Sequence, residues 1–308
     1  MNKVYDLIVV GGGPGGYTAA LYGARAGLRV LVLERLAPGG QMALTHQVDN
    51  YPGFPQGVNG YTLAQDMYRQ AVNFGAESVF VEVLELELSE SPKVVRTDNG
   101  IYYGRTVVIS TGADARKLEL PREEELTGKG VAYCAACDGM FYKGKTVAVV
   151  GGGNTALTDA LLLSRVAQKV YLIHRREEFR ADEVTQRAVR QAENVHLIPN
   201  AQVSQLLGQE RLTGIRIRDV STGFEKELAC DGLFVSIGRK PASALAAQQL
   251  ALDEGGYIVA GEDTVTSIPG VFAVGDVRTK QVRQIVTALA DGAIAVHEAE
   301  KYLARVPG

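Results

Sequence analysis

The sequence has little of what marks several classes of protein. Its 308 residues include only three cysteines, too few for the disulfide framework of a small secreted protein. The first apolar stretch, residues 7–10, follows almost directly on the start of the chain and is far too short for a secretory leader or a membrane span. We therefore expect a soluble, cytoplasmic protein.

A strong charge of either sign is also absent. The 32 basic and 35 acidic residues leave a net charge of -3, so no overall field draws the chain to nucleic acid or to a membrane surface. Potential metal ligands are few. Beyond one Cys-x-x-Cys pair there remain only Cys230 and four scattered histidines, His46, His174, His196 and His297. Because a structural zinc site needs four ligands, we expect no metal.

Glycine, by contrast, is abundant at 35 residues. Many glycines suit a fold with tight turns and close backbone approaches, as nucleotide-binding proteins have. Hydrophobic residues make up 46% of the chain, enough for substantial cores, and the length favours two domains.

The chain repeats one pattern at an interval of 140 residues, the difference between positions 151 and 11. Residues 6–16 (DLIVVGGGPGG) and 146–156 (TVAVVGGGNTA) are each an apolar run followed by three glycines. Each leads into a segment with helical spacing, 17–26 and 157–167, and then into a second apolar run. The repeat predicts two strand–turn–helix–strand units.

Each glycine turn fits the dinucleotide-binding fingerprint. Gly11 would allow the tight turn, Gly13 the approach of a pyrophosphate, and Gly16 the close packing of helix on strand. The second copy has Ala156 at the third position, which the fingerprint permits. Two glycine turns that bind nothing are the bland alternative, and two copies in the same context make it improbable.

The residue that ends each second strand differs between the copies. Glu34 lies 23 residues after Gly11, and a carboxylate there accepts hydrogen bonds from ribose and repels a 2′-phosphate. His174 lies at the same distance from Gly151 and begins a basic cluster with Arg175, Arg176 and Arg180. Because guanidinium groups bind phosphate bidentately, the first site is predicted to hold FAD and the second NADPH. A solvated basic face, balanced by nearby glutamates, is the alternative.

The predicted fold class is α/β, with two Rossmann-like, three-layer ββα nucleotide-binding domains. Residues 106–112 and 233–241 both resemble crossover strands that leave one domain for the other. We expect residues 1–114 and 243–308 to form a discontinuous FAD domain. Residues 115–242 would form an NADPH domain inserted into it.

The motif Cys134-Ala-Ala-Cys137-Asp138 is the predicted chemical centre. Two cysteines at this spacing at a helix start can close a small exchange-competent disulfide. Asp138 could move the proton that the exchange requires. Half a zinc site or two inert cysteines are the alternatives. Cys230 is expected to be a buried small residue before a strand, and His297 a structural residue of the C-terminal helix.

Several further motifs together resemble the low-molecular-weight thioredoxin reductases. They are GGGPGGYTAA, GGQ (39–41), DNYPGFP (49–55), CAACDG, GGGNTA, HRREEFRA (174–181), SIPGVFAVGDV and RQIVTALADG. The resemblance covers nearly the whole chain. It implies a homodimeric NADPH:thioredoxin-disulfide oxidoreductase with non-covalent FAD, which reduces thioredoxin.

The resemblance also implies roles for individual residues. Cys137 would be the thiol beside the flavin, Cys134 the thiol that attacks thioredoxin, and Asp138 the acid–base residue. Asp276 would bind the ribityl chain of FAD. The full set expected at FAD is Gly11, Gly13, Pro14, Gly15, Gly16, Glu34, Arg35, Gly40, Gln41, Asn50, Thr111, Gly112, Gly275, Asp276, Arg283 and Gln284. The set expected at NADPH is Gly151, Gly153, Asn154, Thr155, Ala156, His174, Arg175, Arg176 and Arg180.

The sequence departs from the family pattern in a few places. Ser110 replaces alanine in the usual Ala-Thr-Gly, Thr158 stands where many members have glutamate, and Leu289-Ala290 replaces Ala-Gly. A ferredoxin-dependent relative would lack the NADPH motifs, which are intact here. A glutaredoxin-like acceptor or a peroxiredoxin system stays open, although the extra N-terminal dithiol domain of the latter's reductases is absent.

Chain order implies a motion. The disulfide lies only 14 residues before Gly151, so disulfide and nicotinamide would share one domain while the flavin lies in the other. We expect domain 115–242 to rotate on hinges near residues 113–117 and 240–244, so that each reaches the flavin in turn.

Overall fold

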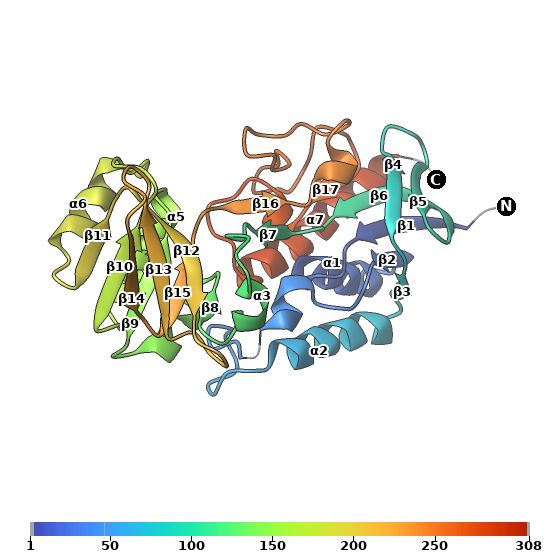
Figure 1. The fold of residues 1–308 in the computed structure, drawn as a ribbon. Coiled ribbons are helices and arrows are strands. Elements are labelled where there is room, and N and C mark those ends of the chain that lie inside the picture. Colours follow the sequence, from blue (N-terminus) through green and yellow to red (C-terminus); the bar gives the residue numbers. More distant parts are fainter. Residues whose placement is uncertain (1–2, 46, 307–308) are drawn as a thin grey trace. The chain divides into compact units, whose positions relative to one another are not determined.

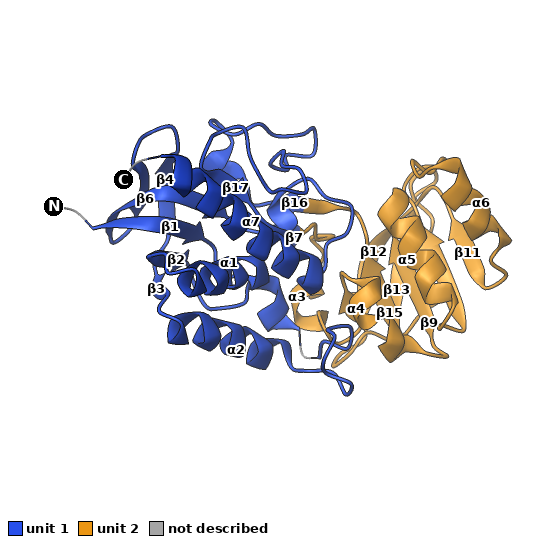
Figure 2. Ribbon diagram, turned by 180° about the vertical axis from the view of Figure 1, so that it is seen from behind, with its two compact units in different colours: residues 1–114, 240–308 blue, residues 115–239 orange. Residues whose placement is uncertain are grey.

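The computed structural model describes residues 3–45 and 47–306, so His46 lies outside the described residues. The chain divides into two compact units (Figure 2): unit 1 is residues 1–114 with 240–308, and unit 2 is residues 115–239. The sequence placed the second boundary three residues later, after 242. The pairing of β16 (Arg239–Pro241) with β7 (Ala113–Ala115) explains the difference, because it joins this segment to the end of the first stretch of unit 1.

Unit 1 is built on a seven-stranded sheet in the order β3-β2-β1-β6-β5-β4 (Figure 1). Strands β1, β2, β3 and β6 run parallel, β17 adds to β6 in parallel, and β4 and β5 form an antiparallel edge. Its strands are β1 (Val4–Val10), β2 (Val30–Glu34), β3 (Glu77–Phe80), β4 (Val83–Glu87), β5 (Lys93–Thr97), β6 (Gly100–Ile109) and β17 (Val271–Ala273).

Both faces of this sheet are buried, which explains the continuous apolar run in β1. Leu7 and Val9 face a core formed with α1 and α7, whereas Ile8 and Val10 face a second core on the opposite side. A parallel strand covered on both faces needs no polar alternation. The helices of unit 1 are α1 (Pro14–Arg25), η1 (Gly40–Leu44), α2 (Gly60–Asn73), η3 (Ala244–Ala246), η4 (Gly275–Val277) and α7 (Ile285–Arg305).

Unit 2 repeats the plan on a smaller scale. A parallel five-stranded sheet has the order β11-β10-β9-β15-β8, and a separate antiparallel sheet has the order β12-β13-β14. Its strands are β8 (Val131–Ala132), β9 (Thr146–Val150), β10 (Lys169–Ile173), β11 (Val195–Ile198), β12 (Ala201–Leu207), β13 (Gly214–Asp219), β14 (Glu225–Ala229) and β15 (Gly232–Val235).

The residues of β9 divide between two cores as those of β1 do. Val147 and Val149 pack with α5, and Ala148 and Val150 pack with the side chains of the antiparallel sheet. Unit 2 is therefore the predicted ββα arrangement of three layers. Its helices are α3 (Glu123–Leu126), α4 (Ala135–Asp138), η2 (Gly139–Tyr142), α5 (Asn154–Ser164) and α6 (Glu183–Gln191).

The helices after the two glycine turns begin three residues earlier than the apolar spacing indicated. Helix α1 starts at Pro14 and α5 at Asn154, with Gly13 and Gly153 as their N-caps. Proline is well suited to the first helical position, because its fixed φ is helical and its missing N–H would have no partner there. Among the described residues, no helix is long and apolar enough to cross a membrane.

Candidate active site

The predicted FAD residues of unit 1 converge on one edge of its sheet. Val10 pairs with Leu33 of β2 and with Ile109 of β6, and Ala273 of β17 also pairs with Ile109. The strands are parallel, so the segments that follow them meet at their common carboxyl edge, where ligands of open α/β sheets bind. These segments carry Gly11–Gly16, Glu34, Thr111–Gly112 and Gly275–Asp276.

The glycine turn of unit 1 has the geometry that a pyrophosphate requires. Gly11 has φ +101°, and a Cβ there would lie 2.6 Å from the carbonyl oxygen of Ser110. A Cβ on Gly13 would meet no atom within 4 Å, so the space over this residue is open. Helix α1 has no side-chain cap, which leaves its first N–H groups available to an anion. The turn therefore fits FAD.

The start of α5 has the same features as that of α1, whereas the starts of α2 and α6 do not. Helix α5 likewise has a glycine N-cap with open space at Gly153 and no side-chain cap. In contrast, Asn59 caps α2 by accepting the Thr62 N–H, and Asp182 caps α6 by accepting the Thr185 N–H. The N-termini of α1 and α5 are thus free in the way that phosphate binding needs.

Glu34 is held in place before any ribose arrives. Its Oε2 accepts the N–H of Gly12 at 2.7 Å, and its Oε1 accepts the N–H of Leu36 at 2.9 Å. Each carboxylate oxygen keeps a further lone pair, so Glu34 can still accept hydrogen bonds from ribose hydroxyls. Arg35 beside it is exposed and forms an ion pair with Glu82 at 3.6 Å.

Other predicted FAD residues contact one another directly. The Asn50 amide donates to Oε1 of Gln284 at 3.0 Å, which joins two motifs 234 residues apart. Gln41 donates to Oδ1 of Asp114 at 2.8 Å, and Asp114 was not among the predicted site residues.

The guanidinium group of Arg283 lies 4.1 Å above the ring of Tyr257, another residue that sequence analysis missed. Thr111 donates its hydroxyl hydrogen to the Ala242 carbonyl at 2.6 Å.

The predicted NADPH residues of unit 2 converge in the same way. Val150 pairs with Ile173 and Val235, so Gly151, His174 and Ser236 follow three adjacent parallel strands. The segment after His174 folds back over the turn. The Arg180 N–H donates to the Gly152 carbonyl at 2.7 Å, and the Asp182 N–H donates to the Asn154 side chain at 2.8 Å.

The basic cluster lies beside this turn, but its members differ in exposure. Arg175, Arg176 and Arg180 are exposed, whereas His174 is only 5% exposed and stacks on Phe179. Burial lowers the pKa of His174, and the charge of Arg180 lowers it further, so the ring is neutral at pH 7. Its Nε2 is the one buried side-chain polar atom without a hydrogen-bond partner in the described part of the chain. Three free guanidinium groups at the turn fit a 2′-phosphate.

Cys134 and Cys137 form a disulfide with a Cα–Cα distance of 5.3 Å. Cys134 is the N-cap of the short helix α4, and its Sγ accepts the Cys137 N–H at 3.2 Å. A donor directed at this sulfur favours the thiolate once the bond is reduced. Both cysteines are partly exposed, and Met140 and Phe141 beside them are exposed apolar residues at 60% and 46%.

Burial raises the pKa of Asp138 to about 6, so this carboxyl can take up and release a proton near neutral pH. Burial raises the pKa of Cys230 to about 12. Cys230 is 3% exposed and precedes β15, so the expectation of a buried small residue before a strand is confirmed.

Two serines that follow corresponding strands were not predicted to matter at the turns. The Ser110 hydroxyl donates to the carbonyls of Val10 at 3.0 Å and Gly11 at 2.5 Å. Ser236 donates to Oδ2 of Asp159 at 2.6 Å, one helical turn into α5. The signal was present in the sequence, because both crossover segments, TVVISTG and LFVSIGR, place a serine after the apolar run.

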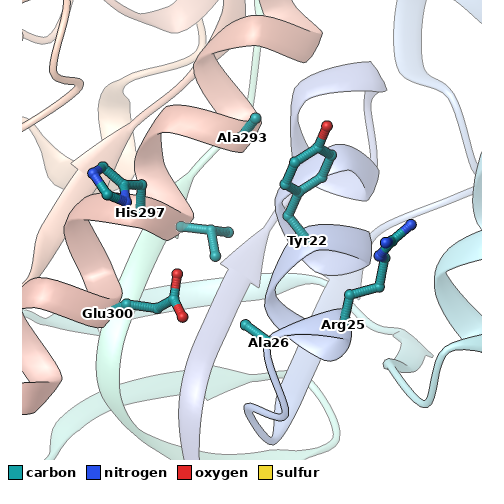
Figure 3. Close-up of a pocket in the computed structure, with 7 residues that line it drawn as sticks. Tyr22, Arg25, Ala26, Ala293, His297 and Glu300 are labelled. Atoms are coloured by element: carbon teal, nitrogen blue, oxygen red, sulfur yellow. The ribbon is translucent and has the colours of Figure 1, made fainter.

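A hollow on unit 1 lies apart from these residues, between α1 and α7 (Figure 3). Tyr22 and Arg25 of α1 and His297 and Glu300 of α7 line it. None of its lining residues was predicted to bind a cofactor. His297 is exposed on the C-terminal helix.

Comparison with known proteins adds a family to this geometry. The pyridine nucleotide-disulphide oxidoreductase family matches residues 5–292. The chain belongs to this family. A thioredoxin reductase of Mycolicibacterium smegmatis is 43% identical, with 98% of both chains covered. A bifunctional thioredoxin reductase/thioredoxin of Mycobacterium leprae is also 43% identical, and the match covers all of this chain and 68% of that protein.

Solved structures agree with this assignment. The thioredoxin reductase of Streptococcus pyogenes has 39% identity and a TM-score of 0.92, covering 99% of this chain and all of that one. The thioredoxin reductase of Giardia duodenalis has the same TM-score at 32% identity, covering 98% of this chain. Membership in the pyridine nucleotide-disulphide oxidoreductases confirms the predicted enzyme class, fold and cofactor pair of FAD and NADPH. The roles of individual residues stay predictions.

Proposed function

We propose that the protein is an NADPH-dependent thioredoxin reductase. Electrons pass from NADPH through FAD to the Cys134–Cys137 disulfide and then to the disulfide of oxidised thioredoxin. The proposal rests on the surroundings of the disulfide. The Cys134–Cys137 disulfide is partly exposed, and the Asp138 carboxyl that follows it has a pKa raised to about 6. The same unit also contains the basic cluster that begins at His174. The bifunctional relative supports thioredoxin as the acceptor, since its name joins the two activities.

Bound FAD supplies the chemistry that converts a two-electron hydride transfer into reduction of a disulfide. Cys134 then attacks one sulfur of the thioredoxin disulfide, forming a mixed disulfide and releasing a thiolate. Cys137 attacks Cys134 to release the second thioredoxin thiol and close the enzyme disulfide again. The N–H of Cys137, directed at the Cys134 sulfur, supports this assignment of the attacking thiol.

Asp138 is proposed to move the protons of this exchange. Each NADPH supplies a hydride, which carries two electrons and one proton. One further proton from solvent completes the two thiols of the product. A carboxyl whose pKa burial raises to about 6 can deliver protons near neutral pH. Exposed Met140 and Phe141 next to the disulfide would give a partner protein an apolar contact.

A rotation of unit 2 is proposed as part of turnover. Its two connections to unit 1 run side by side, since β7 pairs with β16 and the Arg116 N–H donates to the Gly238 carbonyl at 3.0 Å. A cross-link between the two units should stop turnover while one half-reaction continues. Unchanged turnover in the cross-linked protein would refute the rotation.

A homodimer and a cytoplasmic location complete the proposal. Four aromatic side chains of unit 1 are exposed and could be covered by a partner copy. They are Tyr22, Tyr61, Phe74 and Phe80, each between 48% and 56% exposed. Sedimentation of the purified protein tests the dimer.

The proposal is tested by anaerobic titration with NADPH, followed by addition of oxidised thioredoxin. We expect NADPH to bleach the flavin absorbance in wild type, in Cys137→Ser and in Cys230→Ala. Cys137→Ser should then lose thioredoxin reduction by about a thousandfold or more, whereas the buried control Cys230→Ala keeps it.

Each other outcome identifies what is wrong. Bleaching without thioredoxin reduction in the wild type would indicate another acceptor, such as a glutaredoxin-like protein or a peroxiredoxin system. No bleaching would mean that the second nucleotide site is misassigned and would favour a ferredoxin donor.

A further inference from the structure

His174 has an unusual environment for a residue that begins a run of exposed arginines. Its side chain is buried at the glycine turn of unit 2, whereas Arg175 and Arg176 directly after it are exposed. Its Nε2 is the one buried side-chain polar atom without a hydrogen-bond partner in the part of the chain that the structure describes. Leaving such an atom without a partner costs free energy, so the position of the ring must contribute something in return.

The imidazole packs directly on the main chain of the turn. A Cβ on Gly152 would lie 2.2 Å from Cε1 of His174 and 2.4 Å from each ring nitrogen. Gly152 immediately precedes Gly153, the N-cap of α5. The ring can approach the chain this closely only because residue 152 has no side chain. The position of the ring and the path of the turn therefore depend on each other.

The same ring closes the loop that carries the arginines. His174 stacks on Phe179, with ring centroids 5.3 Å apart and an angle of 25° between the ring planes. Phe179 in turn packs against the hydrophobic core that includes Ala156 and Leu157 of α5. Because Arg175 and Arg176 lie between the two stacked residues, the stack fixes both ends of their loop.

Two hydrogen bonds continue this closure after the loop. The Arg180 N–H donates to the Gly152 carbonyl at 2.7 Å, so Gly152 contacts both the first and the last basic residue of the cluster. The Asp182 N–H donates to the Asn154 side chain at 2.8 Å. The segment that carries the arginines is thus returned to the turn, and the ring of His174 lies between that segment and the glycines.

The ring itself is poorly suited to bind a phosphate. Burial lowers the pKa of His174, and the charges of Arg180, Arg175 and Arg176 lower it further, whereas a backbone hydrogen bond with Glu178 acts in the opposite direction. The ring is therefore neutral at pH 7, and its Nε2 is buried. The three arginines are exposed and always charged.

We propose that His174 is a positioning residue whose ring, packed on Gly152 and Phe179, holds the arginine-bearing loop at the nucleotide turn and makes no contact with the 2′-phosphate of NADPH. The inference rests on the proposed function, which assigns this turn to NADPH. The aromatic ring of His174 carries the effect, and its nitrogens do not. Phe179 has an equal share in it, because the stack needs both rings.

Four variants separate the ring from its nitrogens. His174→Ala removes the ring, and Phe179→Ala removes the ring on which it stacks. His174→Phe keeps an aromatic ring and removes both nitrogens. His196→Ala is the matched control, because His196 is a histidine of the same unit that lies beside an aromatic ring, with its centroid 5.9 Å from that of Tyr171, but it is exposed on β11.

The experiment is calorimetric titration of the purified protein with adenosine 2′,5′-bisphosphate and with adenosine 5′-monophosphate. His174→Ala and Phe179→Ala should each weaken binding of the bisphosphate about tenfold or more and of the monophosphate less than about threefold, because only the first ligand has a 2′-phosphate. His174→Phe and His196→Ala should stay within about threefold of wild type for both ligands. The double variant His174→Ala with Phe179→Ala should lose about as much as one single variant, because both changes remove the same stack.

A pH series tests the neutral ring directly. The dissociation constant of the bisphosphate in His174→Phe, divided by that in wild type, should stay constant from pH 8 to pH 6. Titration of the ligand's own phosphates cancels in this ratio. An imidazolium that bound the phosphate would form at low pH in wild type alone, so the ratio would rise as the pH falls.

Several results would overturn the inference. They are unchanged bisphosphate affinity in His174→Ala or Phe179→Ala, an equal loss for both ligands, additive losses in the double variant, a loss in His174→Phe as large as in His174→Ala, and a ratio that rises toward pH 6. A wild-type protein that binds the bisphosphate no more tightly than the monophosphate would instead overturn the assignment of NADPH to this turn, and with it the proposed function.

Discussion

The two glycine turns have one backbone plan and two different chemistries. In unit 1 the residue that ends the second strand, Glu34, is an acceptor whose oxygens take the N–H groups of Gly12 and Leu36. In unit 2 the equivalent residue, His174, packs its ring against Gly152, where a Cβ would lie 2.2 Å from the imidazole. The two strand ends therefore offer different chemistry at corresponding places in the two units, and this difference supports the proposal that unit 1 binds FAD and unit 2 binds NADPH.

The turns also differ at their third position, and this difference should produce the largest effect. A Cβ on Gly16 would lie 2.1 Å from the Gly11 carbonyl oxygen and 2.6 Å from the Ser110 hydroxyl, whereas unit 2 accommodates Ala156. Gly16→Ala should destabilise unit 1 by about 3 kcal/mol or more and abolish FAD retention. The reciprocal Ala156→Gly should cost only about 1 kcal/mol.

Thermal unfolding and the flavin content of the purified variants measure both effects. Equal losses in Gly16→Ala and Ala156→Gly would show that the two turns have the same steric limit, and the comparison would fail at this position.

Buried carboxyls respond to pH in opposite directions in the two units. Asp291 of unit 1 has a lowered pKa, so its contribution to stability is present above pH 4 and is lost as the pH falls through its folded pKa. Asp138 of unit 2 has a pKa raised to about 6, so its contribution is complete below pH 4 and is lost as the pH rises through about 6.

Asp138→Asn should therefore stabilise the protein at pH 8 by at most about 3 kcal/mol, and by about half as much at pH 5. It should also slow thioredoxin reduction, because the proton carrier is lost. Urea unfolding at both pH values measures the first effect, and stopped-flow reoxidation measures the second. An equal gain in stability at pH 5 and pH 8 would contradict a raised pKa for Asp138.

The basic cluster should separate the two nucleotides. Arg175→Ala with Arg176→Ala should raise the KM for NADPH about thirtyfold or more and leave the KM for NADH nearly unchanged, because only NADPH has the 2′-phosphate. Arg216→Ala with Arg218→Ala, which removes two arginines paired with glutamates on β13, is the matched control. Equal increases for both nucleotides would show that the cluster does not bind this phosphate.

The serines behind the turns should give the smallest effects. Ser110→Ala removes a donor to two backbone carbonyls and should cost about 1 kcal/mol in unit 1. Ser236→Ala removes the hydrogen bond to Asp159, whose pKa burial already raises, so the pKa of Asp159 should rise further. NMR titration of the Asp159 carboxyl measures this shift. A fall in its pKa would contradict the role assigned to Ser236.

The sequence predicted the parts of the molecule that local patterns encode. Residues 7–10 and the glycines that follow are a strand and a turn whatever surrounds them, and the repeat at position 151 doubled the signal. The start of each helix was three residues off, because Pro14 and Asn154 belong to the first turn but not to the apolar stripe. The spacing of Cys134 and Cys137 indicated their disulfide.

Sequence reasoning missed the contacts between distant segments. Nothing near Asp291 in the sequence marks it as the acceptor for Arg278, Lys280 and the Gly275 N–H, since the partners come from a separate turn. Gln41 and Asp114 are 73 residues apart for the same reason. The burial of His174 also depends on packing, because Phe179 and Gly152 enclose a ring that the sequence shows only as part of a basic run.

The pairing of β7 with β16 means that unit 2 is inserted into unit 1 through two neighbouring connections. The Ala242 N–H donates to the Gly112 carbonyl at 3.0 Å, so the chain returns to unit 1 beside the point where it departs. A short linker between these neighbouring points could replace residues 115–239 without distorting unit 1. The arrangement lets evolution, or an engineer, exchange unit 2 for another folded module and leave unit 1 intact.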